Sequence, residues 1–194
     1  KILVAMIELT DHPTIYKPTP EEILAYEEKH GREATVALLM EREELIKSEK
    51  DDPFNYRQVL PHWKDAKKLL DTHDQLLISG GNRSGKTAFA AWYVVNLLTQ
   101  VEGARVACFS MTHQSSIRDQ QPAVYEMLPK EFKKMKRGQI QNVKYTQKNG
   151  FSDGTFVLPN GSQCWFNAYQ QPIDVLEGFE ASGIWMDELC PYTW

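Results

Sequence analysis

The sequence predicts an α/β fold in which helices flank a mainly parallel central sheet. Three short apolar runs have the length of buried strands: 76–78, 105–110 and 183–186. An apolar helical stretch at 88–98 separates the first run from the second, and this strand–helix–strand order is typical of parallel sheets. Turn residues at 159–161 lie between two alternating segments, 155–158 and 162–168, which predicts an antiparallel hairpin added at one edge of the sheet.

The beginning of the chain is predicted to be helical. Thr19-Pro20-Glu21-Glu22 combines a capping threonine, a proline at the first helical position and the glutamate of a capping box. Gly31 ends that helix, and a second helix follows over 32–50. Two more helices are expected later, over 61–70 and over 115–128 with an interruption near Pro122. We therefore expect a helical lead-in over residues 1–52 and a separate domain over 53–194.

The residues between the first strand and the apolar helix match a phosphate-binding loop. They fit G-x-x-x-x-G-K-[ST] and are Gly80, Gly81, Asn82, Arg83, Ser84, Gly85, Lys86 and Thr87. In such a loop the backbone N–H groups and the N-terminus of the following helix face the phosphates. Lys86 is expected to reach the β and γ oxygens, and Thr87 to bind Mg²⁺. Arg83 either reaches the γ-phosphate or a neighbouring subunit, or faces solvent. The loop predicts a nucleoside triphosphate site of the P-loop NTPase class.

Two carboxylates follow the last predicted strand, and they complete the expected site. Asp187 and Glu188 come directly after the run at 183–186. Because parallel strands deliver their C-terminal ends to one crevice, Asp187 is expected to share the Mg²⁺ shell with Thr87. Glu188 can orient and polarise the attacking water, which predicts a hydrolytic site with Glu188, Lys86 and Arg83 as catalytic residues. Candidate coupling residues, expected to sense the γ-phosphate or to touch a polymer, are Thr112 and His113.

Composition and charge restrict the other functions. The chain has a net charge of −4, but residues 130–148 carry seven bases and one acid, a net of +6. This basic segment is the best local candidate for contacting a phosphate backbone, with an ordinary solvated face as the alternative. The three cysteines form no C-x-x-C pair, which argues against a disulfide framework or a zinc site. No apolar run is long enough to cross a bilayer, so no membrane partner is expected.

Five motifs occur in an order that resembles the N-terminal ATPase domain of tailed-bacteriophage terminase large subunits. They are the loop 81–87, the turn Pro159-Asn160-Gly161-Ser162, the strand residues Cys164-Trp165-Phe166, Leu176-Glu177-Gly178, and Ile184-Trp185-Met186-Asp187-Glu188. The resemblance covers roughly residues 53–194. The loop alone is generic, and the hairpin together with the spacing to Asp187 gives the specificity.

The resemblance implies an ASCE-type P-loop fold and a motor that couples Mg-ATP hydrolysis to translocation of double-stranded DNA into a procapsid. It assigns the loop lysine to Lys86, the Walker B aspartate to Asp187 and the catalytic glutamate to Glu188. It further implies a homo-oligomeric ring at the procapsid in the host cytoplasm, with the portal protein and the small terminase subunit as partners. The full-length protein is expected to be an endonuclease as well.

The chain departs from the family pattern at two places. An adenine-contacting glutamine is common in the segment before the loop, but residues 61–65 contain none and Gln58 is the nearest. Residues 167–186 contain no arginine, so the arginine finger is left to Arg83, Arg118 or a residue beyond Trp194. Two alternatives stay open: another ASCE-type, helicase-like ATPase that remodels nucleic acids, and a nucleotide-binding switch that does not hydrolyse.

Overall fold

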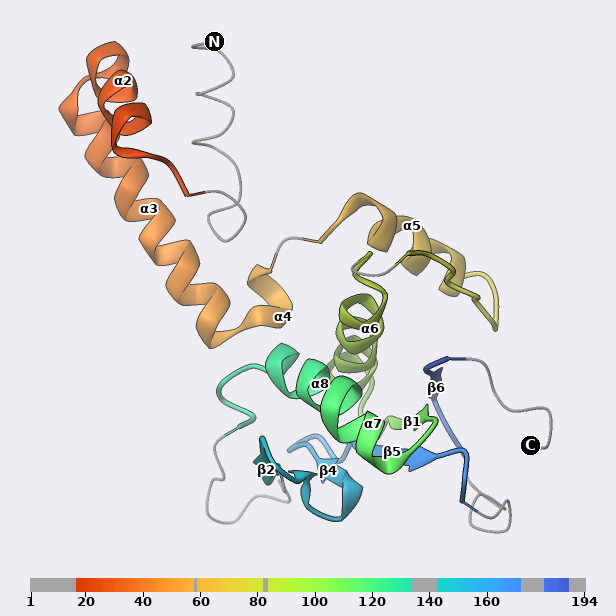
Figure 1. The fold of residues 1–194 in the computed structure, drawn as a ribbon. Coiled ribbons are helices and arrows are strands. Elements are labelled where there is room, and N and C mark those ends of the chain that lie inside the picture. The colour runs from red at the N-terminus through yellow and green to blue at the C-terminus, as the bar shows by residue number, and fades with distance from the viewer. Residues whose placement is uncertain (1–16, 58, 82–83, 134–142, 172–179, 189–194) are drawn as a thin grey trace. The chain divides into compact units, whose positions relative to one another are not determined.

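The chain divides into two compact units, Lys1–Gln58 and Val59–Trp194 (Figure 1). The computed structural model describes residues 17–57, 59–81, 84–133, 143–171 and 180–188. No helix in these ranges is both long enough and apolar enough to span a membrane. The predicted division into a helical lead-in over residues 1–52 and an ATPase domain over 53–194 stays a prediction.

The first unit is helical where it is described. Its helices are α2 (Pro20–His30), α3 (Arg32–Asp51) and α4 (Pro53–Tyr56). The predicted capping box is present, because the Thr19 hydroxyl accepts from the Glu22 N–H at 3.3 Å and the Glu22 carboxylate accepts from the Thr19 N–H at 2.7 Å. Gly31 separates α2 from α3 with a φ of 83°, a left-handed value that glycine adopts without strain. The two predicted helices are therefore confirmed.

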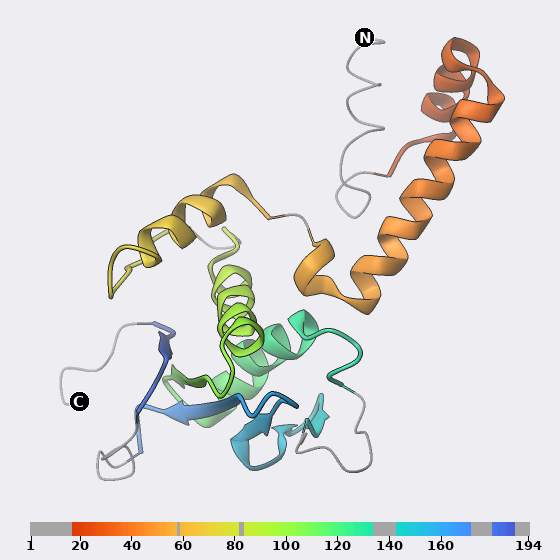
Figure 2. The same cartoon turned by 180° about the vertical axis from the view of Figure 1, so that it is seen from behind.

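The second unit is built on a four-stranded sheet in the order β4-β5-β1-β6. The strands are β1 (Arg105–Ser110), β4 (Thr155–Val157), β5 (Gln163–Ala168) and β6 (Gly183–Met186). β1 pairs in parallel with both β5 and β6, whereas β4 pairs antiparallel with β5. The sheet is therefore mixed and mainly parallel, as predicted. A separate two-stranded hairpin is made by β2 (Tyr145–Thr146) and β3 (Gly150–Phe151), and Figure 2 shows it at the end of the unit away from β6.

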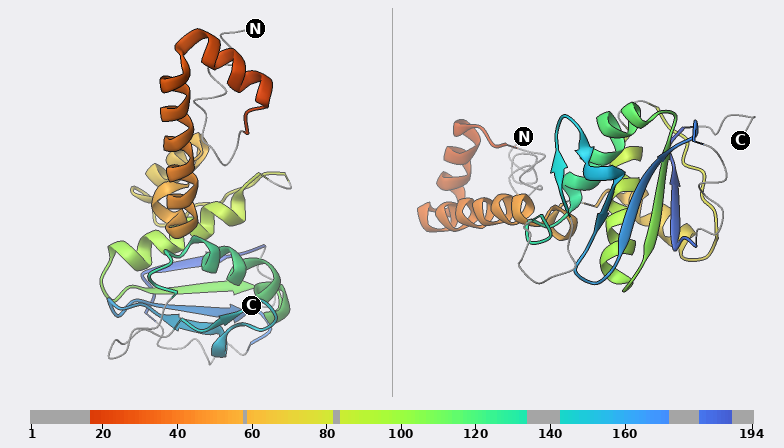
Figure 3. Two further views of the ribbon diagram at one scale, coloured as in Figure 1. Left: turned by 90° about the vertical axis from the view of Figure 1, so that its left-hand side faces the viewer. Right: turned by 90° about the horizontal axis from the view of Figure 1, so that it is seen from below.

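Helices pack on the sheet and supply a large part of the core. They are α5 (Pro61–Leu70), α6 (Lys86–Gln100), α7 (His113–Ser115), the π-helix η1 (Ser116–Gln120) and α8 (Gln121–Met127), and a short 3₁₀ turn, η2 (Ser152–Gly154), precedes β4. Figure 3 shows α6 and α8 over the same face of the sheet. α6 contacts β1 and β6, and its Ala91, Val95 and Leu98 are fully buried.

Two predictions about strands are wrong. Residues 76–78 do not form a strand, and Leu77 is 86% exposed and Ile78 39% exposed. β6 was expected to be buried, yet its Ile184 is 60% exposed, because β6 is at the end of the sheet and pairs only with β1. A strand forms only where a neighbour supplies hydrogen bonds. Among the described residues no strand lies on the outer side of β6 or beside 76–78.

Two further elements differ in detail from the expectation. The predicted hairpin is β4–β5, but only β4 is at the edge, because β5 also pairs with β1 and is an inner strand. The helical stretch after β1 is not interrupted at Pro122, which lies in the first turn of α8, where a missing N–H costs nothing. The irregularity comes earlier, as the π-helix over Ser116–Gln120.

Candidate nucleotide-binding site

The N-terminus of α6 has the features of an anion site. Its N-cap is Gly85, with φ 80° and ψ 11°, a left-handed conformation that other residues adopt only with strain. Among the described residues no side chain caps this helix, and its first turn contains no acidic residue. The first backbone N–H groups and the positive end of the helix dipole are therefore available to a negatively charged ligand.

An aromatic cluster of α5 and α6 packs against the start of the phosphate loop's helix at Gly85. Trp63 on α5 is 4% exposed, and its ring packs against Phe89 and Trp92 of α6 with centroids 6.0 and 6.3 Å away. A Cβ placed on Gly85 would lie 3.4 Å from the Trp63 indole nitrogen. The loop therefore rests directly on the indole, and α5 fixes the position of the turn that leads into α6.

The loop lysine bonds to its own loop. The Lys86 ammonium donates to the carbonyl of Gly80 at 2.7 Å, to the carbonyl of Gly81 at 2.8 Å and to the Ser84 hydroxyl at 3.3 Å. The cation is thus held over the turn where the phosphates of a nucleotide are expected. Thr87 is the second residue of α6. Asn82 and Arg83 lie outside the described residues, so the predicted role of Arg83 stays a prediction.

The structure brings the loop and the two carboxylates to the same end of the unit. α6 runs opposite to β6, because a Cβ on Gly183, at the start of β6, would lie 2.5 Å from Leu97 near the end of α6. Lys86, which begins α6, and Asp187, which follows β6, are consequently at the same end. The Asp187 N–H donates to the Phe109 carbonyl at 2.9 Å, which continues the pairing of β6 with β1 past the strand.

Asp187 is half-buried among charged groups. Burial raises the pKa of its carboxyl group above the ordinary value, the negative charges of Glu188 and Asp119 raise it further, and the Lys86 ammonium lowers it. The opposing effect of Lys86 shows that the lysine and the carboxylate share one electrostatic environment. A half-buried carboxylate among other acids favours a bound cation, which would relieve the repulsion.

Glu188 and Arg118 complete this charged cluster. Glu188 is exposed and has a φ of 66°, a left-handed backbone that is uncommon outside glycine and is typical of functional positions. Arg118 donates to Asp119 at 2.7 Å, and this hydrogen bond, the charge of Asp119 and the charge of Glu188 raise the arginine's pKa. Arg118 is therefore near the proposed catalytic carboxylate.

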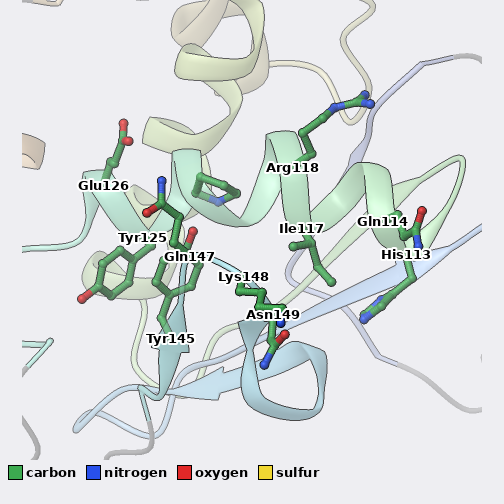
Figure 4. Close-up of a pocket in the computed structure, with 11 residues that line it drawn as sticks. His113, Gln114, Ile117, Arg118, Tyr125, Glu126, Tyr145, Gln147, Lys148 and Asn149 are labelled. Carbon is green, nitrogen blue, oxygen red and sulfur yellow. The ribbon is translucent and has the colours of Figure 1, made fainter.

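The two candidate coupling residues have different surroundings. The Thr112 hydroxyl accepts from the Ser115 N–H at 3.0 Å and caps α7, so it is engaged within its own helix. His113 is exposed and lines a groove between the α7–α8 segment and the β2–β3 hairpin (Figure 4). Of these two residues, therefore, only His113 lines the groove, whereas the Thr112 side chain is bonded within α7.

The donor set fits magnesium held together with a nucleotide. Among the described residues no group of three or more His, Cys, Asp and Glu side chains could hold a metal ion alone. Magnesium in nucleotide sites is typically bound through one or two protein oxygens and the phosphates themselves. The hydroxyl of Thr87 and the carboxylate of Asp187 are such oxygens, and their role stays a prediction.

Sequence reasoning missed two residues near the carboxylates. Asp119 acts electrostatically on Asp187, and Gln120 is fully buried and donates from its side-chain amide to the Phe109 carbonyl at 2.9 Å. Both belong to η1, where a π-turn inserts an extra residue and rotates the following side chains. The helical period of 3.6 residues therefore could not show which way they face.

Comparison with known proteins gave one family. The family model described as terminase large subunit, T4likevirus-type, N-terminal, matches residues 77–192. The match spans the phosphate loop, the whole sheet and the Asp187–Glu188 pair. The comparison with curated proteins gave no match.

Proposed function

The chain belongs to the family of T4-type terminase large subunits, in its N-terminal part, and from this membership we propose that it is the ATPase motor that drives double-stranded DNA into a procapsid. The observation that carries the proposal is the shared position of two distant motifs. The phosphate loop at the start of α6 and the carboxylates after β6 are at the same end of the unit. Such a pair is what a magnesium–triphosphate unit requires.

The roles follow from the chemistry of each group. The uncapped N–H groups of α6 bind the phosphates, and Lys86 exchanges its loop carbonyls for phosphate oxygens. Thr87 and Asp187 hold Mg²⁺, which when bound neutralises charge on the phosphates. Glu188 accepts a hydrogen bond from the attacking water and orients it towards the γ-phosphate, and Arg83 is placed in the loop to stabilise the charge that develops.

The proposal extends to the assembly. The motor works as a homo-oligomeric ring at the procapsid in the host cytoplasm, with the portal protein and the small terminase subunit as partners and ATP and Mg²⁺ as ligands. In the full-length protein an endonuclease accompanies it. These statements rest on the family rather than on contacts within this chain.

A pair of substitutions tests the catalytic assignment. Glu188→Gln removes the base but keeps the shape of the side chain, so we expect phosphate release to fall about 10²–10⁴-fold while the nucleotide affinity stays within a few-fold. Lys86→Ala should instead weaken nucleotide binding itself, by about tenfold or more. Steady-state phosphate release and nucleotide titration, measured on the full-length protein with DNA present, separate the two effects.

The matched control is Glu180→Gln, an exposed glutamate before β6. It makes the same chemical change away from the loop and should leave turnover unchanged. Parental turnover in Glu188→Gln would remove the catalytic role of this residue. A full-length protein that binds ATP and releases no phosphate with DNA and portal present would instead be a nucleotide-binding switch.

A further inference from the structure

A broad groove shares Arg118 with the charged cluster of the candidate nucleotide site, because Arg118 lines the groove and also interacts with Glu188. Its volume is about 1080 Å³. The α7–η1–α8 segment forms one wall, with His113, Ile117 and Tyr125, and the β2–β3 hairpin forms the other, with Tyr145 and Lys148 (Figure 4). The volume is at the upper end of the range for small-molecule clefts, and several polar side-chain tips line the space. A space of this size that is open at the surface fits an extended ligand better than a small enclosed one.

The two walls are fixed to each other before any ligand binds. The Gln121 side-chain oxygen accepts from the Phe151 N–H at 2.8 Å, which ties α8 to β3. The rings of Tyr125 and Tyr145 stack across the walls with centroids 4.1 Å apart. Gly150 has a φ of 70°, and a Cβ there would overlap the Gln121 amide, so the hairpin approaches α8 as closely as a backbone can. The groove is therefore preformed.

The charge of the groove and its border is mainly positive. Lys148 lies in the groove, and the exposed Lys144 immediately precedes β2. The ammonium of Lys133 lies 4.8 Å from the centre of the Tyr125 ring. Three described lysines of the basic segment 130–148, namely Lys133, Lys144 and Lys148, therefore lie in the groove or next to its walls. Glu126 is the only acid among the lining residues, and Figure 4 shows its carboxylate pointing away from Lys148.

We propose that this groove binds the phosphate backbone of duplex DNA. The inference rests on the proposed function, for which it names the gripping surface. Lysine ammonium groups and tyrosine hydroxyls are donors that contact phosphate oxygens. The two tyrosine rings stack on each other rather than presenting open faces, so the surface offers no platform for unstacked bases. Contacts of this kind hold a duplex without reading its sequence.

The same π-helix connects the groove with the nucleotide site. Ile117 and Arg118 of η1 both line the groove, and Arg118 also interacts with Asp119 and Glu188 (Figure 4). A duplex pressed against Ile117 therefore acts on the segment that carries Arg118. We expect duplex DNA to change the rate of phosphate release through this segment.

The test removes one positive charge from the groove, at Lys148, and one from its border, at Lys144. Lys144→Ala with Lys148→Ala in the full-length protein should weaken binding of a fluorescent duplex of about 30 base pairs roughly tenfold near 0.1 M salt. The slope of log affinity against log salt should fall by about 2, one for each lost phosphate contact. The matched control, Lys64→Ala with Lys68→Ala, removes two exposed lysines from α5 and should leave both quantities at the parental value.

A second measurement does not depend on affinity. A photo-crosslinking residue in place of Asn149, in the turn that borders the groove, should form a covalent adduct with the duplex, and one in place of the exposed Thr72 should not. If the parent binds DNA but the groove variant keeps its affinity and salt slope and Asn149 gives no adduct, the inference is wrong and the proposed function survives. If the full-length parent binds no duplex with any nucleotide, the proposed function itself fails.

Discussion

At the scale of single residues, the charge of Asp187 has an energetic cost that its proposed role as a magnesium ligand explains. Burial and the nearby acids raise the pKa of its carboxyl group above the ordinary value of 3.8. The folded protein therefore binds more protons than the unfolded chain, and stability falls as the pH rises from 3.8 through the raised pKa. A functional carboxylate kept in this position at neutral pH destabilises the fold unless a cation is bound.

Asp187→Asn removes the charge and keeps the size of the side chain. At pH 7 without magnesium we expect the melting temperature to rise by about 1–3 °C. Because the raised pKa is gone, the loss of stability above pH 4 should become shallower in the variant. ATP turnover should be lost. Thermal unfolding between about pH 4 and 7 checks the sign, and a variant that melts lower than the parent at pH 7 would contradict it.

Residue-level predictions from the sequence succeeded where a motif fixes the backbone. The apolar stretch at 88–98 predicts a helix directly after the loop, and α6 occupies Lys86–Gln100. The apolar run at 183–186 is a strand, and Asp187 follows it as predicted. Asp119 was missed because its approach to Asp187 depends on a π-turn, which leaves no mark in the apolar pattern. The metal and catalytic roles themselves stay predictions.

At the scale of elements, the β2–β3 hairpin depends on a glycine for two separate reasons. Gly150 has a positive φ, and it faces the Gln121 amide with no room for a methyl group. Gly161 has an equally unusual φ of 81° but open space around its Cβ position. Substituting each glycine by alanine therefore distinguishes the cost of backbone strain, present at both positions, from the cost of steric overlap, present only at Gly150.

Gly161→Ala should lower the free energy of unfolding by about 1–2 kcal/mol, the strain of a left-handed alanine. Gly150→Ala should cost about 1–3 kcal/mol more, because the overlap also forces the hairpin away from α8. Denaturant titration of both variants gives the difference. Equal losses would show that the hairpin is not held tightly against Gln121.

The strands predicted from the sequence exist where they pair with neighbours in the sheet, but the strand predicted at 76–78 does not form. The apolar composition of β1 marks an inner strand, and β1 is paired on two sides. β5 was expected at the edge of the sheet, as one strand of the hairpin, but it is also paired on two sides. Residues 76–78 are apolar like β1, but their neighbour in a sheet is a long-range property that composition does not contain. The exposure of Ile184 on β6 has the same origin.

At the scale of the whole molecule, the division after Gln58 separates the lead-in from the unit that carries the site. α5 belongs to the second unit, where Trp63 covers Phe89 and Trp92 and supports Gly85. The helix before the loop is therefore part of the site, although it contributes no predicted ligand.

Two truncations test this organisation. A protein that begins at Val59 should unfold cooperatively and bind nucleotide, because its core is intact. A protein that begins at Asp71 lacks Trp63 and should lose at least the roughly 3–5 kcal/mol associated with removing a buried tryptophan. Calorimetry and nucleotide titration compare the two. Equal nucleotide affinity in both would show that α5 does not support the loop.

One backbone oxygen accepts two hydrogen bonds with different origins. The Phe109 carbonyl bonds to the Asp187 N–H and to the buried Gln120 amide, both at 2.9 Å. Gln120→Met keeps the volume and removes one of the two donors, while Asp187 still satisfies the oxygen, so the cost in stability should be only about 1 kcal/mol. In the full-length protein we expect near-parental basal phosphate release with a reduced response to duplex DNA. If duplex DNA stimulates phosphate release in Gln120→Met as strongly as in the parent, the hydrogen bond from Gln120 to the Phe109 carbonyl does not couple the two sites.

The Phe109 carbonyl therefore joins the residue that follows β6 to the π-helix whose Ile117 lines the groove. In the proposed function, this single backbone oxygen couples the nucleotide site to the groove that we assign to DNA.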